Sequence, residues 1–293
     1  MTDTEGPAPG PSEIAPGLYL VGTPIGNLGD ASARLKRVLA AASTIAAEDT
    51  RVARRLLSAL GIPAPKLVRC DEEVSAALAP RLVDAARGSV VAFVSDAGMP
   101  GIADPGAALV CAADAAGVPV TCVPGPSALA TALALSGLPA EPFLFLGFLP
   151  AKAGPRARRL AEFREVKATL VAFESPHRLA ETLDAMATVL GDRPACVVRE
   201  MTKLHEERKT GTLGTLAAHY AAGEPRGEIV LVVGPPSEAD ADPLDPEALD
   251  ARIEAALKTH GVRDAADRVA AATGLARRQV YARALELAGK KRT

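Results

Sequence analysis

The stretch SVVAFVSDAGMPGIADPGAALVCAADAAG, residues 89–117, places an apolar run, a long loop and a helical pattern in direct succession. The apolar run predicts a buried strand, and AALVCAADAAG predicts a helix. The loop between them, SDAGMPGIADPG at 95–106, holds three glycines and two prolines, and Asp96 and Asp104 offer acceptors. It is longer than the roughly 2 to 6 residues that such a connection needs. We interpret it as a ligand loop at the carboxyl end of a strand, with an ordinary βα turn as the alternative.

Strands and helices alternate in the same way on both sides of this stretch. Strand-length apolar runs lie at 17–22, 43–48, 66–70 and 119–125, and amphipathic stretches separate them. Apolar strands with little alternation, connected by helices, predict a mainly parallel sheet covered on both faces. The fold class is therefore α/β, with ligands expected at the carboxyl ends of the strands.

A second series of strands and helices follows, and after it the composition changes. The sequence predicts a tail at 1–15, an α/β domain at 16–142, a second α/β domain at 143–234, an acidic, proline-rich linker at 235–248 and a helical module at 249–293. The last two helical patterns join at a turn containing Gly274, which is compatible with a helix-turn-helix and also with a plain helical bundle.

Charge is distributed unevenly along the chain, although the net charge is only −2. Residues 234–250 contain six acidic and no basic residues, whereas residues 251–293 contain ten basic and four acidic ones. A basic module suits a polyanion such as RNA. A solvated helix face without a ligand is the alternative.

Composition excludes several classes of protein. The chain has 293 residues, 48% of them apolar, without an apolar run long enough for a membrane span and without a basic, apolar start typical of a signal peptide. We therefore expect a cytoplasmic protein that does not bind a membrane. The four cysteines and four histidines show no metal-ligand spacing, so no metal site is expected. Cys111, Cys122 and Cys196 lie in apolar runs and are expected to be buried.

Three further loops resemble the first in being rich in glycine, proline or both at a strand end: GTPIGNLGD at 22–30, VPGPSA at 123–128 and ESPHR at 174–178. Four such loops at one edge of two sheets predict a cleft between the domains, where small ligands commonly bind. None is a GxGxxG or GxxxxGK[ST] motif, which disfavours dinucleotides and ATP.

These motifs, together with AEDTR at 47–51, FLFLGFLP at 143–150, REMTKLHEE at 199–207 and GEIVLVV at 227–233, occur in order over residues 17–233. In this order they resemble the bacterial ribosomal RNA small-subunit methyltransferase I family. The resemblance implies a tetrapyrrole methylase fold, S-adenosylmethionine as cofactor, a homodimer, and 2′-O-methylation of a cytidine in the decoding region of 16S rRNA. The implied partner is 16S rRNA, within the 30S subunit, and not DNA.

Matching the family's cofactor loops position by position implies nine binding residues: Pro24, Asp96, Ala97, Gly98, Met99, Ser127, Ala128, Phe173 and Glu228. The family more often has threonine at position 99 and serine at position 103, where this chain has methionine and alanine. Cofactor binding through the backbone would tolerate both differences.

A ribose hydroxyl is a weak acid, so its methylation calls for a proton acceptor or a nearby cation. AEDTR, ESPHR and REMTK supply the candidates. We expect Arg51, Arg178 and Lys203 to hold RNA or oxyanion charge, and Glu174 or Glu200 to accept the proton. Each group also has a structural alternative: a helix cap and ion pair at 48–51, a helix start at 174–176, and a solvated hairpin edge at REMTKLHEER.

Two other functions stay open at this level. One is a small-molecule tetrapyrrole methylase or an enzyme like diphthine synthase, against which the basic C-terminal module and the cluster Lys152, Arg156, Arg158 and Arg159 argue. The other is a non-catalytic RNA-binding assembly factor. It leaves the four strand-end loops unexplained.

Overall fold

The structure is a computed structural model that describes residues 14–102, 106–223, 225–236, 246–273, 275 and 277–290. The chain divides after Pro235 into two compact units, which are treated separately below. Several predicted features lie outside the described residues: the tail up to residue 13, Ala103 and Asp104 of the long loop, most of the linker, and Gly274.

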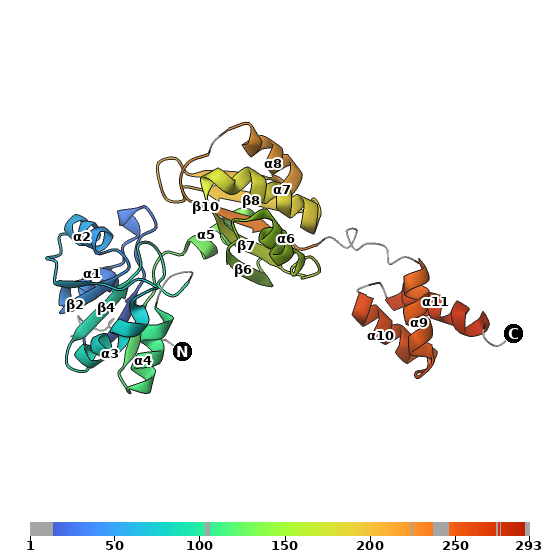
Figure 1. Ribbon diagram of the computed structural model, residues 1–293, viewed down its shortest axis with the longest axis horizontal. Helices are drawn as coiled ribbons and strands as arrows, with labels where there is room; N and C mark the ends of the chain where they lie inside the picture. The colour runs from blue at the N-terminus through green and yellow to red at the C-terminus, as the bar shows by residue number, and fades with distance from the viewer. Residues whose placement is uncertain are drawn as a thin grey trace, which may run out of the picture. The chain divides into compact units, whose positions relative to one another are not determined.

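The first half of the larger unit is built on a five-stranded sheet of order β3-β2-β4-β1-β5 (Figure 1). All its paired strands run parallel, as the apolar runs predicted. Its strands are β1 (Gly17–Val21), β2 (Thr44–Ala47), β3 (Lys66–Arg69), β4 (Val90–Val94) and β5 (Val120–Val123).

Alternate side chains of these strands enter two separate cores, one on each face of the sheet. One core contains Ile45, Val90 and Ala92 and packs against α1 (Ala33–Ala41) and α2 (Thr50–Ala59). The other contains Ala46 and Phe93 and packs against α3 (Ser75–Ala86) and α4 (Ala107–Ala115). The sheet is therefore covered on both faces, and its ligand-binding edge is the one formed by the loops after the strands.

The second sheet has the order β6-β7-β10-β8-β9 and is mixed: β6 and β7 are parallel, and the other pairs are antiparallel. Its strands are β6 (Phe143–Phe148), β7 (Thr169–Glu174), β8 (Pro194–Arg199), β9 (Glu207–Thr212) and β10 (Ile229–Val233). β9 is not among the apolar runs, because this edge strand consists mainly of charged residues, threonine and glycine. Its pairing with β8 confirms the hairpin interpretation of REMTKLHEER.

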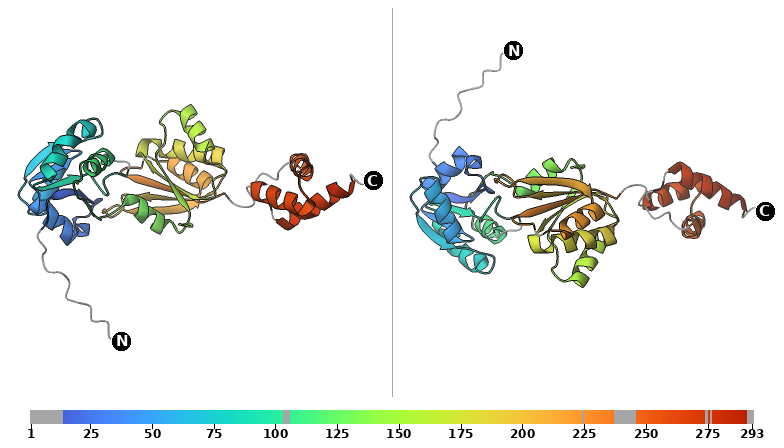
Figure 2. Two further views of the ribbon diagram at one scale, coloured as in Figure 1. Left: turned by 90° about the horizontal axis from the view of Figure 1, so that it is seen from below. Right: turned by 90° about the horizontal axis from the view of Figure 1, so that it is seen from above.

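Helices cover both faces of this sheet too (Figures 1 and 2). α5 (Ala128–Ser136) packs on one face through Ala132 and Leu133. The other face is covered by α6 (Ala153–Ala161), α7 (Leu179–Leu190) and α8 (Leu213–Ala221). Two short 3-10 helices, η1 (Leu28–Asp30) and η2 (Pro176–Arg178), lie in the loops of the ligand-binding edge.

The smaller unit contains α9 (Pro246–Leu257), α10 (Val262–Thr273) and α11 (Arg277–Lys290) around a core of its own. Several of its basic side chains are engaged within the unit. Arg283 Nε donates to Asp250 at 2.7 Å, and Arg277 is paired with Asp267. The count of basic residues in the sequence therefore overstates the charge that is free to meet a partner.

Two expectations about individual side chains are wrong. Cys111 and Cys122 are exposed, because they lie on the outer sides of α4 and β5, whereas Cys70 and Cys196 are buried. In the cluster Lys152, Arg156, Arg158 and Arg159, Arg156 is only 3% exposed and pairs with Glu181, so it adds little charge to the surface. In the part of the chain that the structure describes, no helix is long and apolar enough to cross a bilayer.

Candidate functional site

A cavity of about 400 Å³ lies where loops of the two sheets meet. All four predicted loops contribute to it. The loop at 22–30 provides Ile25, and the loop at 95–106 provides residues 97–99 and Ile102. The loop at 123–128 provides residues 127 and 128, followed by Leu129 of the next helix, and the loop at 174–178 provides residues 174–176. Its remaining lining comes from Phe148, Phe173, Met201 and residues 227–230. The predicted convergence of these loops is confirmed, and we call this space the first cavity.

The loops around the first cavity are joined by short backbone contacts. Thr23 N–H donates to the carbonyl of Gly98 at 2.9 Å, and Gly98 N–H donates back to Thr23 at 3.2 Å. Gly98 has φ +80°, a conformation that favours glycine. A Cβ on Gly22 would collide with Gly125 and with the Met99 sulfur, which accepts a hydrogen bond from Gly125 N–H at 3.2 Å. Glycine is thus required where these loops touch.

A bulge in β6 brings an aromatic side chain to the first cavity. The pairing of β6 with β7 shifts between Phe145 and Phe148, and Gly147 there has φ +65°. Phe148 remains 62% exposed and lies edge to face on Phe173, with ring centroids 5.5 Å apart. Bulges commonly redirect a side chain beside a functional site, and here the bulge adds an exposed aromatic wall.

Glu174 is the buried carboxylate of the first cavity, with its side chain fully shielded. It accepts hydrogen bonds from Ser175 N–H at 2.6 Å, Thr182 Oγ1 at 2.6 Å and Arg178 Nε at 2.8 Å, and a longer one from the Ser175 hydroxyl. These donors occupy most of its lone pairs. These bonds anchor the Glu174 side chain, which fixes Arg178 and the start of η2.

A second cavity, of about 380 Å³, adjoins the first and shares Ile25, Ala97 and Glu228 with it. Its other lining residues are Thr23, Pro24, Gly26, Leu28, Val52, Arg55, Leu56, Ala59, Asp96 and Lys203. Thr23 is 1% exposed, and its hydroxyl has no hydrogen-bond partner among the described residues. A buried hydroxyl without a partner costs free energy, and this one belongs to a residue that lines the second cavity.

Lys203 forms one wall of the second cavity and is held by two carboxylates. Its ammonium donates to Glu200 at 2.8 Å and to Glu228 at 3.0 Å. Desolvation alone would lower the pKa of Lys203, but the hydrogen bonds to Glu200 and Glu228 outweigh it and raise the pKa. The bond from Lys203, with that from Glu228 N–H, lowers the pKa of Glu200. Both groups therefore stay charged across the neutral range.

The turn that carries Lys203 is conformationally strained. Glu200 and Thr202 have φ +51° and +66°, values that residues other than glycine rarely adopt. Gly227, with φ +90°, leaves the space that the Glu200 carboxylate fills. Strain of this kind is kept mainly at functional sites, and here it aims Lys203 at the loop of Gly26, against which its aliphatic stem packs.

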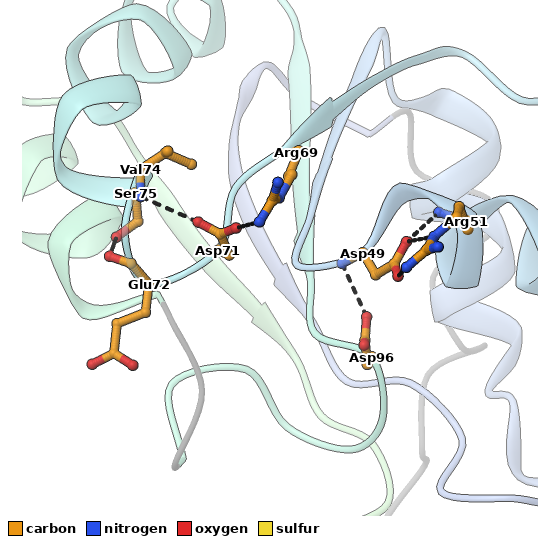
Figure 3. A network of polar contacts seen from close by, with 8 residues as sticks. All are labelled: Asp49, Arg51, Arg69, Asp71, Glu72, Val74, Ser75 and Asp96. Carbon is orange, nitrogen blue, oxygen red and sulfur yellow. Dashed lines mark hydrogen bonds and ion pairs between the residues drawn. The ribbon is translucent and has the colours of Figure 1, made fainter.

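A polar network surrounds the carboxyl ends of β2, β3 and β4 (Figure 3). Asp49 caps α2 and pairs with Arg51, whose side-chain hydrogen bond lowers the pKa of Asp49 to about 2. Asp49 N–H donates to the Asp96 carboxylate at 3.0 Å. Desolvation, reinforced by the charge of Asp49, raises the pKa of Asp96. Asp96 is thus the better proton acceptor of the two.

The predicted site residues fall into three groups. Seven of the nine predicted cofactor residues line the first cavity, while Pro24 and Asp96 line the second. Of the residues predicted to carry the reaction, Glu174 lines the first cavity and Lys203 the second, with Glu200 bonded to Lys203. Arg51 and Arg178 line neither cavity; Asp49 and Glu174 hold them.

Sequence reasoning missed several lining residues. Met201 and Gly227 escape because their positions depend on the strained turn, for which the sequence gives no signal. A signal for Phe148 was present in the sequence, because a glycine inside a strand pattern, here Gly147, often marks a bulge. Arg55 could have been found from the spacing of α2, since it lies one turn after Arg51.

Two family models match the chain. The family described as tetrapyrrole (corrin/porphyrin) methylases matches residues 17–217, and the C-terminal HTH domain of RsmI matches residues 242–288. Among solved structures, a diphthine synthase covers 74% of this chain and 89% of its own at 15% identity, with a TM-score of 0.58. At that identity the likeness shows the fold alone.

Sequence relatives are much closer. The ribosomal RNA small subunit methyltransferase I of Mesorhizobium japonicum is 47% identical over 277 residues, which are 94% of this chain and 93% of the relative. The protein of the same name from Erythrobacter litoralis is 46% identical over 94% of this chain and 96% of its own length. The chain therefore belongs to the ribosomal RNA small subunit methyltransferase I family, within the tetrapyrrole methylases.

Proposed function

We propose that this protein transfers a methyl group from S-adenosylmethionine to the 2′-oxygen of a cytidine ribose in the decoding region of 16S rRNA. Membership of its family supports the general part of this proposal, the methylation of small-subunit ribosomal RNA. One observation supports the finer part: the cavity suited to a methyl donor adjoins a second cavity whose mainly apolar lining includes the charged residues Arg55, Asp96 and Lys203.

The first cavity fits S-adenosylmethionine in size and chemistry. Its volume of about 400 Å³ lies within the roughly 300 to 1,000 Å³ of small-molecule pockets. Apolar side chains such as Leu129 and Phe173 suit the adenosine, and the exposed carboxylate of Glu228 suits a cationic ligand. When bound, the cofactor supplies a methyl carbon activated by the adjacent sulfonium charge. The nine residues assigned from the family resemblance are proposed to hold it, Pro24 and Asp96 from the side of the second cavity.

The chain's own residues have two tasks in the second cavity: to orient the ribose and to take the proton of its hydroxyl. We assign orientation to Thr23, whose hydroxyl is free to bond, and charge stabilisation to Lys203, which stays protonated. Asp96 is the proposed proton acceptor, because its raised pKa makes it a stronger base than its neighbour Asp49.

These assignments change the roles expected for two glutamates. Glu174 and Glu200 are bound to cations and hydrogen-bond donors, so we propose that they position Arg178 and Lys203 and do not themselves accept a proton. Arg51 is proposed to contact RNA from the first turn of α2, where its side chain is 87% exposed. Arg178 is proposed to support the wall of the first cavity.

Labelled methyl transfer tests the proposed reaction. The acceptors are 30S particles and naked 16S rRNA, both from cells that lack the protein. We expect one labelled ribose, at a linkage that resists alkaline hydrolysis because its 2′-oxygen is blocked, and we expect 30S particles to be preferred. Label on a base, or on neither acceptor, contradicts the proposal. Asp96→Asn should bind the cofactor and lose most of the transfer rate.

The assembly and the compartment belong to the same proposal. We propose a homodimer that acts in the cytoplasm, where the small ribosomal subunit is found. Light scattering at micromolar concentration should give twice the chain mass of 30.0 kDa. A mass of one chain contradicts the dimer.

A further inference from the structure

α1 and α2 form a basic surface on the larger unit, of which the proposed function uses only Arg51. The two helices contain no aspartate or glutamate, and they pack on the same face of the first sheet (Figure 1). Six of their residues carry positive charge: Arg34, Lys36, Arg37, Arg51, Arg54 and Arg55. All six are exposed, and together they are called the α1–α2 surface below.

Most of this charge is not used inside the protein. Arg51 pairs with Asp49. The side chains of the other five form no ion pair or hydrogen bond with any residue that the structure describes. Self-repulsion of unpaired charges disfavours the folded state, so the surface gains its use from a partner of opposite charge.

The rest of the larger unit lacks a comparable surface among its described residues. On the opposite face of the same sheet, α3 and α4 hold one arginine, Arg81, against Asp84 and Asp114. On α6, Arg156 is buried against Glu181, and Arg159 pairs with Glu162. Lys152, at the start of α6, and Arg158, in its last turn, are exposed and form no ion pair among the described residues, but they are two cations against five unpaired ones on the α1–α2 surface.

The α1–α2 surface borders the second cavity. Val52, Arg55 and Leu56 of α2 line that cavity directly, opposite Lys203. A strand that follows the basic helices would therefore reach the cavity in which the Thr23 hydroxyl lacks a partner among the described residues. Six charges distributed over two helices suit several phosphates better than a single small anion.

We propose that the α1–α2 surface binds the phosphate backbone of RNA and guides the target nucleotide into the second cavity. This inference rests on the proposed function for the identity of the nucleic acid. The larger unit would then contact RNA itself, in addition to any contacts made by the helices after residue 245. Phosphate contacts give affinity and register without reading sequence.

The test uses the full-length protein with two pairs of substitutions. Arg37→Gln with Arg54→Gln removes two unpaired charges from the α1–α2 surface. Arg81→Gln with Lys167→Gln removes two exposed charges elsewhere, also without an ion pair among the described residues, and serves as the matched control. Binding to 16S rRNA and to oligocytidylate is measured against salt concentration, and the affinity for S-adenosylmethionine is measured by calorimetry.

Every phosphate that the protein no longer neutralises lowers the slope of log affinity against log salt by about one. The first pair should lower that slope by about two and weaken RNA binding about tenfold or more, without changing cofactor affinity. The control pair should change neither. Equal effects of the two pairs, or none, would overturn the proposal. RNA binding does not depend on turnover, so a failure of methyl transfer in the wild type would contradict the proposed function and leave this test readable.

Discussion

At the scale of single residues, two buried threonine hydroxyls differ in whether a residue of the protein bonds to them. Thr182 is fully buried, and its hydroxyl donates to Glu174 at 2.6 Å. Thr23 is 1% exposed, and its hydroxyl has no partner among the described residues. The first hydroxyl stabilises the fold by satisfying a buried carboxylate, whereas the second costs stability. A residue that costs stability is the one to test for contact with the substrate.

Thr23→Val and Thr182→Val should therefore act in opposite directions. The free energy of unfolding should rise by about 1 kcal/mol in Thr23→Val, because valine removes an unsatisfied polar atom, and fall by about 1–3 kcal/mol in Thr182→Val. We also expect the KM for RNA to rise about tenfold in Thr23→Val, and urea unfolding with initial-rate kinetics measures both effects. If Thr23→Val lost stability, or kept its KM for RNA, the hydroxyl would not be the ligand-binding group.

At the scale of elements, the sequence predicted what depends on local pattern. Buried strands such as β4 and β10 are continuous apolar runs, and their order along the chain predicts a covered sheet. β9 lacks this signal, because an edge strand of charged residues, threonine and glycine gains its structure from its neighbour β8. The loops of the site were predicted from glycine and proline. Which side chains they turn inward depends on pairings between segments far apart in the sequence, such as that of Thr23 with Gly98.

The bulge in β6 offers a test of one such pairing. Gly147 has φ +65°, and a Cβ there would meet nothing within 4 Å; Gly154 in α6 also has open space around it, without the positive φ. Gly147→Ala should lower the free energy of unfolding by about 1–2 kcal/mol, since alanine is strained in that conformation. Gly154→Ala should change it by less than about 1 kcal/mol, because the gain from a stiffer unfolded chain is offset by the contact of the new Cβ with the ring of Pro155.

Because Gly147 sets the direction of Phe148, Gly147→Ala should also weaken S-adenosylmethionine binding in calorimetry, and Gly154→Ala should not. Unchanged cofactor affinity in the Gly147→Ala variant would mean that Phe148 is not a wall of the cofactor site.

At the scale of the whole molecule, net charge hides where the chain can meet RNA. A total of −2 contains a basic pair of helices in the larger unit and a smaller unit with ten basic residues after residue 250. Ion pairs decide how much of that charge is available. Arg277 and Arg283 are held by aspartates, whereas Arg263 and Arg278 are exposed and have no ion-pair partner among the described residues. Two separate basic surfaces on two units would let one long RNA engage both, as linked binding sites do.

Removing residues 236–293 tests this division of labour. The larger unit keeps its own cores, so its cofactor affinity should change less than twofold, while its affinity for 16S rRNA falls and depends less steeply on salt. In the full-length protein, Arg263→Gln with Arg278→Gln should lower the salt slope by about two without loss of stability. Arg277→Gln with Arg283→Gln should instead loosen the helical unit, seen in its own unfolding transition, because these arginines hold α10 and α9 to α11. An RNA affinity unaffected by the truncation would leave the α1–α2 surface as the main RNA contact and give the helical unit another role.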